Sequence, residues 1–171
     1  GNRYFFLRDE FNDAQKNRWK NSITSLLLTF GGTDQNNLSK KLYIAIKDLC
    51  KKNNVSINIV TGPGYKYYEQ LCDTIKNDYN TVLTRSTGVI SSIMEKCQIA
   101  IISNGRTVYE LAHMNIPALI ISHHERETTH NFSSEKNGFI PIGIYKKGYT
   151  EKIVRKELNT LILDKYKRKR L

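Results

Sequence analysis

Short apolar segments alternate with helical patterns six times along this chain. Between the first two segments, for example, Leu38, Leu42 and Ile46 recur at the spacing of one helix face. The run at 99–102 is apolar throughout, which is typical of a strand buried on both faces of a parallel sheet. The alternation therefore predicts an α/β fold in which helices cover both faces of a six-stranded parallel sheet. The expected strands are residues 25–30, 57–61, 81–84, 99–103, 118–122 and 139–144.

We expect a doubly wound, Rossmann-like sheet with the strand order 3-2-1-4-5-6. In that order the first and fourth strands are neighbours, and ligands bind at the switch point beyond their carboxyl ends. The turns that follow these two strands are residues 31–33 and 103–107, and each is marked by glycine. Topology and sequence pattern thus predict a ligand site in one crevice.

The segment 99–112 indicates what kind of ligand this crevice suits. A buried strand turns through Asn104 and Gly105 directly into a helical pattern that includes Val108 and Leu111. Such a turn leaves backbone N–H groups unpaired at the positive end of a helix, which favours an anion such as phosphate. Gly105 lets the backbone approach closely because it has no Cβ. An ordinary strand-to-helix turn is the alternative interpretation of this segment alone.

The net charge of +11 invites a nucleic-acid interpretation, but its distribution weakens it. The last seven residues carry five positive charges, which leaves +6 (eleven minus five) for the rest of the chain. We expect this terminal run to be solvated and to bind nucleic acid only nonspecifically. The remaining excess suits an anionic ligand or surface. The length predicts a main domain over 21–163, with a linker segment over 1–20 entering from an upstream domain and a basic tail over 164–171.

Several protein classes lack their motifs in this sequence. A dinucleotide-binding turn needs G-x-G-x-x-G and a P-loop needs G-x-x-x-x-G-K-[ST], and neither occurs. The histidines do not form H-E-x-x-H and the three cysteines are far apart, so we expect no metal and no cofactor. We also find no signal-peptide pattern and no apolar run of the roughly 20 residues that span a bilayer. A cytoplasmic protein with reduced thiols is therefore expected.

Three spaced motifs, taken together, resemble one family. They are TFGGTD at 29–34, SNGRTVYELA at 103–112 and NIPAL at 115–119. With LRDEF at 7–11, they resemble the C-terminal half of a GT-B fold and are most similar to the UDP-sugar hydrolase of pseudaminic acid biosynthesis. The N-acetylglucosaminyltransferase that makes lipid II is more distantly similar. The resemblance covers residues 4–145 and implies a domain that grips the nucleotide of a UDP-sugar in a cleft facing a second, N-terminal domain.

The resemblance also implies roles for individual residues. Glu110 would hold the ribose hydroxyls, and the backbone near Gly88 and Val89 would receive the uracil edge. The turns after the first and fourth strands would hold the diphosphate, through Gly31, Gly32, Thr33, Asn104, Gly105, Arg106, Thr107 and Val108. The residues themselves offer a second interpretation of Glu110, because Thr107 to Glu110 also match a capping box.

The charged loop after the fifth strand is the expected sugar side of the site. The family often places a glutamine-containing loop here, whereas residues 123–132 contain no glutamine. The candidates for contacts in this chain are His124, Arg126, Glu127 and His130. Arg126 opposite a diphosphate and a solvated charged loop are both compatible with the sequence.

The predicted function is that of the nucleotide-sugar-binding half of a UDP-sugar hydrolase in cell-surface polysaccharide or nonulosonic acid biosynthesis. The resemblance assigns the catalytic base to the N-terminal half, so we expect this chain to be inactive by itself. The alternative enzyme is a GT-B glycosyltransferase, in which a sugar hydroxyl replaces water. The alternative of another class is a basic binding module for nucleic acid or an anionic surface. The expected partners are a UDP-type nucleotide-sugar and the upstream domain, without specific nucleic acid and without a transmembrane segment.

Overall fold

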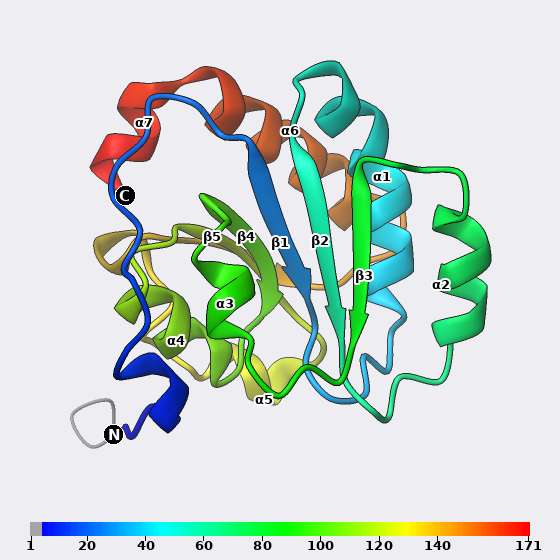
Figure 1. Ribbon diagram of the computed structural model, residues 1–171, viewed down its shortest axis with the longest axis horizontal. Helices are drawn as coiled ribbons and strands as arrows, with labels where there is room; N and C mark the ends of the chain where they lie inside the picture. Colours follow the sequence, from blue (N-terminus) through cyan, green and yellow to red (C-terminus); the bar gives the residue numbers. More distant parts are fainter. Residues whose placement is uncertain (1–4) are drawn as a thin grey trace.

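One sheet of six parallel strands forms the centre of the protein. The computed structural model describes residues 5–171, and its strands have the order β3-β2-β1-β4-β5-β6 (Figure 1). The predicted fold class and strand order are therefore confirmed. The strands are β1 (Ser25–Thr29), β2 (Ser56–Thr61), β3 (Thr81–Arg85), β4 (Ile99–Ser103), β5 (Ala118–Ser122) and β6 (Phe139–Ile144).

Strand β1 lies between β2 and β4, as the switch-point argument requires. Leu26 of β1 is in register with Ile57 of β2 on one side and with Ile99 of β4 on the other. The chain leaves β1 toward one half of the sheet and β4 toward the other half. The two glycine-marked turns therefore emerge at the same edge, where neighbouring parallel strands end.

Helices cover both faces of the sheet. Helices α1, α2 and α6 share a hydrophobic cluster with Leu28, whereas α3, α4 and η2 share another cluster with Leu27. Successive strand residues point to opposite faces, which is why these two leucines belong to different layers. In Figure 1, α3 and α4 lie in front of the sheet and α1 lies behind it. The helices are η2 (Asp9–Phe11), α1 (Leu38–Lys52), α2 (Tyr68–Ile75), α3 (Ser91–Met94), α4 (Thr107–His113), α5 (Glu125–Thr128), η3 (Glu135–Asn137), α6 (Tyr149–Leu163) and α7 (Lys165–Arg170).

The entering segment packs against the layer of α3 and α4. Phe11 is 1% exposed within the core of that layer. The backbone N–H of Asn17 donates to the carbonyl of Met114 at 3.0 Å, and its side-chain amide donates to the carbonyl of Met94 at 2.9 Å. These contacts tie the described part of the predicted linker segment to the domain. Residues 1–4 of that segment lie outside the described residues.

The basic C-terminal segment is folded onto the domain, so the expectation of a solvated tail is wrong for its central residue. Residues 165–170 form α7, and the Asp164 carboxylate accepts hydrogen bonds from two backbone N–H groups of its first turn at 2.9 Å. Arg168 is 5% exposed and donates to the backbone carbonyls of Leu161 and Asn21. A charge run in sequence did not indicate that one of its members fills a buried position.

The thiols and the helix lengths agree with a compact α/β domain. None of the helices between residues 5 and 171 is long and apolar enough to cross a membrane. Cys50 and Cys97 are buried and unpaired. Burial raises the pKa of the Cys50 thiol to about 12 and that of the Cys97 thiol to about 11, so both are unreactive at neutral pH.

Candidate functional site

A cleft of about 400 Å³ opens at the carboxyl ends of the central strands. It lies where the strand order predicts a ligand site. The cleft brings together four of the eight residues that were expected to hold a diphosphate, along with Glu110. Its walls are formed by Gly31 and Gly32 after β1, Gly62 and Pro63 after β2, Ser86 and Thr87 after β3, Arg106, Thr107 and Glu110 at the start of α4, and Arg8 from the entering segment.

The Gly-Pro-Gly turn after β2 is a part of the site that the sequence expectations did not include. A Cβ on Gly62 would lie 2.3 Å from the Cα of Gly32, so the two backbones touch. The N–H of Gly64 also donates to the carbonyl of Gly32 at 3.0 Å. Only glycine permits such an approach. The signal that could have revealed this turn is a Gly-x-Gly sequence directly after a buried strand at the same edge of the sheet.

The turn between β4 and α4 offers fewer free amides than predicted. The N–H of Gly105 donates to the carbonyl of Ser103 at 2.9 Å, and the N–H of Val108 donates to the carbonyl of Gly105 at 3.2 Å. Among the described residues, the amides of Arg106 and Thr107 have no backbone partner. Of the N–H groups of residues 105–108 that were expected to hold the diphosphate, those of Arg106 and Thr107 therefore stay available to a ligand. Helix α4 has seven residues, so its dipole is a weaker source of positive potential than the Arg106 side chain.

Open backbone faces occur at all four of the predicted glycines. A Cβ on Gly31, Gly32, Gly88 or Gly105 would meet no atom within 4 Å. Gly31 has a φ of +75°, which an L side chain rarely adopts. The turn after β1 is thus held from behind by Gly62 and is bare on the side that faces the cleft.

Glu110 pairs with Arg8 of the entering segment, 102 residues away in the chain. The Nε and Nη2 of Arg8 lie 3.1 and 3.0 Å from the same carboxylate oxygen, Oε1. No residue of the described chain hydrogen-bonds the other oxygen, Oε2. The capping-box interpretation is wrong, because Thr107 is the first residue of α4, Arg106 is its N-cap, and no side-chain cap bond forms.

The Arg8 side chain is itself held in place by two other contacts. Its Nη1 lies 2.9 Å from the Glu10 carboxylate, and Glu10 accepts a hydrogen bond from the backbone N–H of Ser91 at 2.8 Å. The guanidinium lies 5.5 Å from the centroid of the Phe11 ring. A series of polar contacts therefore runs along the cleft, from Glu110 through Arg8 and Glu10 to the start of α3. The sequence contains the segment LRDEF but gives no indication of which carboxylate Arg8 meets.

Burial raises the pKa of the Glu110 carboxyl above its ordinary value. The attraction and the hydrogen bond of Arg8 oppose this shift, and the nearby Glu10 carboxylate reinforces it. The Glu110 side chain is 8% exposed, which explains why the loss of hydration dominates. The surroundings of the Glu110 carboxylate thus disfavour its ionised form. A ligand that donates hydrogen bonds to this carboxylate could compensate for the lost hydration.

This raised pKa predicts a pH-dependent stability. A carboxyl with a raised pKa in the folded state stabilises folding fully below its unfolded pKa of about 4.3, and that contribution is lost as pH rises through the folded value. We therefore expect the Glu110→Gln variant to become more stable relative to the wild type as pH rises from 4 to 7. The free energy of unfolding of the variant minus that of the wild type should increase over this range. Urea titrations of both proteins across this range check the prediction. A pH-independent difference between them would contradict it.

The loop that was expected to receive uracil borders the cleft. Ser86 and Thr87 line the cleft, and the predicted Gly88 and Val89 follow them directly. Ser86 has a φ of +50°, and its N–H donates to the carbonyl of Thr61 at the end of β2. The loop is thus anchored to the sheet at its first residue, whereas Gly88 and Val89 themselves do not line the cleft.

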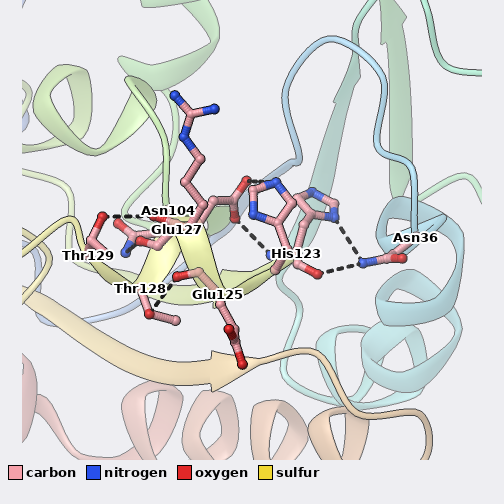
Figure 2. Close-up of polar contacts among 9 residues, drawn as sticks. Asn36, Asn104, His123, Glu125, Glu127, Thr128 and Thr129 are labelled. Atoms are coloured by element: carbon pink, nitrogen blue, oxygen red, sulfur yellow. Dashed lines mark hydrogen bonds and ion pairs between the residues drawn. The ribbon is translucent and has the colours of Figure 1, made fainter.

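A second, smaller cavity of about 220 Å³ lies on the other side of the Gly31-Gly32 turn. Thr33, His124 and Glu127 line it, so the expected sugar-side loop does contribute to this region. Figure 2 shows how the loop is tied down: the Asn36 amide donates to the carbonyl of His123, and Glu127 accepts from the N–H of His123. The loops after β1 and β5 are thereby connected across the end of β4.

Asn104 is a structural residue in this arrangement. It is 5% exposed, and its side-chain amide donates to the backbone carbonyl of Glu127 at 2.7 Å (Figure 2). Its role is thus to connect the β4 turn to α5. The predicted Arg126 and His130 are exposed and line neither cavity. Over residues 5–171, no three His, Cys, Asp or Glu side chains gather as metal ligands would.

The sheet order and the switch-point cleft define a doubly wound α/β domain of the GT-B kind. Solved structures share this fold. A putative UDP-N-acetylglucosamine 2-epimerase from Listeria monocytogenes matches 98% of this chain and 42% of its own, with a TM-score of 0.63 and 12% identity. MurG from Acinetobacter baumannii matches 93% of this chain and 45% of its own, with a TM-score of 0.59 and 18% identity. TarM from S. aureus in complex with UDP matches 91% of this chain and 33% of its own, with a TM-score of 0.58 and 12% identity.

Two curated proteins are similar in sequence, and no protein-family model matches the chain. The uncharacterized protein MJ1062 of Methanocaldococcus jannaschii is 29% identical over 132 residues, which is 73% of this chain and 27% of that protein. The spore coat polysaccharide biosynthesis protein SpsG of Bacillus subtilis is 22% identical over 126 residues, 73% of this chain and 37% of that protein. The chain therefore spans only 27% of the length of the first relative and 37% of the length of the second.

Proposed function

We propose that this chain is the nucleotide-binding half of an enzyme that acts on a UDP-sugar. The observation that carries the proposal is the cleft at the switch point, which combines bare glycine backbone, two arginines and one buried carboxylate. An anionic diphosphate fits the bare turn and Arg106, and a ribose diol fits the unpaired Oε2 of Glu110. The fold is shared with the UDP complex of TarM and with the putative UDP-N-acetylglucosamine 2-epimerase of Listeria monocytogenes.

The reaction we propose for the whole enzyme is hydrolysis of the UDP-sugar, in cell-surface polysaccharide or nonulosonic acid biosynthesis. The similarity of residues 29–34 and 103–112 to the hydrolase supports this reaction, and the name of SpsG supports a role in polysaccharide biosynthesis. Transfer to a sugar hydroxyl is the second candidate, favoured by the fold likeness to WaaG, a glycosyltransferase involved in lipopolysaccharide biosynthesis.

The catalytic base is proposed to come from a second domain. Among the described residues, Glu110 alone brings a carboxylate to the larger cleft, and it is already paired with Arg8. No histidine or cysteine of the described chain lines that cleft. The residues present can therefore bind and orient a nucleotide but offer no free base to activate water or an acceptor hydroxyl.

Calorimetry with UDP, CDP, ADP and NAD tests the binding function on this chain. We expect UDP to bind only weakly, with a dissociation constant on the order of 1 mM, because half of the enclosing surface is proposed to belong to the other domain. Gly32→Val should weaken this binding by about tenfold or more, because its side chain would fill the bare face of the turn. Its melting temperature should stay close to that of the wild type, since a Cβ on Gly32 meets no atom within 4 Å. A preference for NAD, or no binding of any nucleotide at millimolar concentration, would contradict the proposal.

A further inference from the structure

The end of the molecule opposite the cleft carries a second concentration of charge. Helix α7 lies there beside the entering segment (Figure 1). The place is the amino-terminal edge of the sheet, because Gln98, Pro117 and Gly138, which precede three of its strands, line the same cavity. We call the exposed side chains gathered there the α7 surface: Arg18, Trp19, Lys20, Tyr166, Lys169 and Arg170.

The α7 surface is rigidly attached to the domain. Arg168, on the inner side of α7, donates to the backbone carbonyls of Leu161, Ile162 and Asn21. Its guanidinium lies 5.5 Å from the centroid of the Trp19 ring. The helix and the entering segment are therefore held together by one buried cation, and their outer side chains keep a fixed arrangement.

The cations of this surface have no acidic partners. None of Arg18, Lys20, Lys169 and Arg170 forms an ion pair with a described residue. By contrast, Lys167 of the same helix lies 2.8 Å from the Glu157 carboxylate. Such an uncompensated group of cations attracts an anionic partner.

No described residue contributes a carboxylate side chain to the cavity within this surface. Its volume is about 370 Å³, and neither aspartate nor glutamate is among the residues that line it. Its floor includes the apolar residues Ala112, Ile116 and Pro117. The cavity thus combines a cationic rim with an apolar interior, which suits a partner that presents anionic and aliphatic groups together.

Large apolar side chains are exposed beside these cations. Trp19 is 49% exposed and Tyr166 is 69% exposed, and Leu163 at the end of α6 is 67% exposed. Tryptophan and tyrosine favour the interface between a bilayer and water, and lysine and arginine clusters bind anionic lipid headgroups. The combination is typical of a protein that lies on a membrane surface.

We propose that the α7 surface docks this domain onto an anionic phospholipid bilayer. The headgroup phosphates pair with the four cations, and Trp19 and Tyr166 enter the interfacial region. In this orientation the amino-terminal edge of the sheet faces the membrane and the nucleotide cleft opens away from it. The inference is independent of the proposed function, because none of its residues lines the cleft.

Nucleic acid is the other polyanion to consider, and the observations favour the bilayer. Phosphates of RNA would pair with the same cations, and Trp19 could stack on a base. The exposed Leu163 and the apolar floor of the cavity, however, have no complementary group on a nucleic acid. Binding of a single-stranded RNA is therefore included as an outcome of the test.

The test uses Trp19, which is the only tryptophan of the chain. The protein is titrated with vesicles of phosphatidylcholine alone or with about 30% phosphatidylglycerol, in about 0.1 M salt. We expect the Trp19 emission to shift to the blue only with the anionic vesicles, because the ring leaves water for the interface. The affinity should fall as the salt concentration rises.

Two triple variants with the same change in net charge make the test specific. The first variant combines Lys20→Gln, Lys169→Gln and Arg170→Gln. It should weaken vesicle binding by at least about tenfold, while Arg168 is unchanged and still holds α7 in place. The control replaces Lys66, Lys146 and Lys147 by glutamine, three exposed lysines at the opposite edge, and should bind as the wild type does. An equal loss in both variants, an unshifted Trp19 emission, or tighter binding of single-stranded RNA than of anionic vesicles would overturn the proposal.

Discussion

Gly62→Ala is expected to destabilise the protein by at least about 2 kcal/mol and to abolish nucleotide binding. The added Cβ would lie 2.3 Å from the Cα and 2.5 Å from the carbonyl oxygen of Gly32. Backbone cannot move aside as the end of a side chain can, so the turns after β1 and β2 must separate. For a chain of this length the loss corresponds to a fall in melting temperature of about 4–8 °C. Thermal unfolding and UDP calorimetry of the same variant measure both effects.

Gly105→Ala is the matched control for this variant. A Cβ on Gly105 meets no atom within 4 Å, so the melting temperature should change by less than about 2 °C. Both glycines follow a central strand at the same edge of the sheet, and they differ in whether another backbone touches them. An unchanged melting temperature for Gly62→Ala would show that the close approach of the two turns contributes nothing to stability.

Glu110→Gln is expected to weaken UDP binding by about 10- to 150-fold, which corresponds to about 1.5–3 kcal/mol. The carboxylate would accept hydrogen bonds from two ribose hydroxyls, whereas the amide has only one accepting atom and no charge. The melting temperature at neutral pH should stay the same or rise slightly, because burial disfavours the ionised carboxyl. Affinity and stability are thus expected to change in opposite directions.

Glu10→Gln separates this role from the pairing with Arg8. Glu10 contacts the same guanidinium and the N–H of Ser91, but it does not line the cleft. We expect this variant to lower UDP affinity by less than about threefold. If Glu110→Gln binds UDP as tightly as the wild type, Glu110 serves only to hold Arg8 and the entering segment.

The strands and their order could be predicted because the evidence for them is local. A strand buried on both faces, such as 99–102, appears as a continuous apolar run, and glycine or proline marks its end. The alternation of strands with helices then restricts the topology to a parallel, doubly wound sheet. The same reasoning located the edge of the sheet at which the cleft is found, because it needs only the first and fourth strands to be neighbours.

The side-chain partners within the site could not be predicted, because they depend on contacts between distant segments. Arg8 and Glu110 are 102 residues apart, and no spacing rule connects them. The capping box was a plausible local pattern, but tertiary pairing with Arg8 determined where Glu110 points. The contact of Gly62 with Gly32 likewise exists only because β1 and β2 are adjacent.

The sequence by itself determined the fold, the edge that carries the cleft and the glycine turn after β1 that borders it. Local hydrophobic period and backbone permissiveness indicate these features, because their signals lie within short segments of the chain. The tertiary structure alone decided which amides stay free in the β4 turn, which cation meets Glu110 and which arginine of the basic run is buried. These outcomes depend on which polar groups become buried when the segments pack together. A buried polar group needs a hydrogen-bond or ion-pair partner, and the fold decides which residue is near enough to provide it.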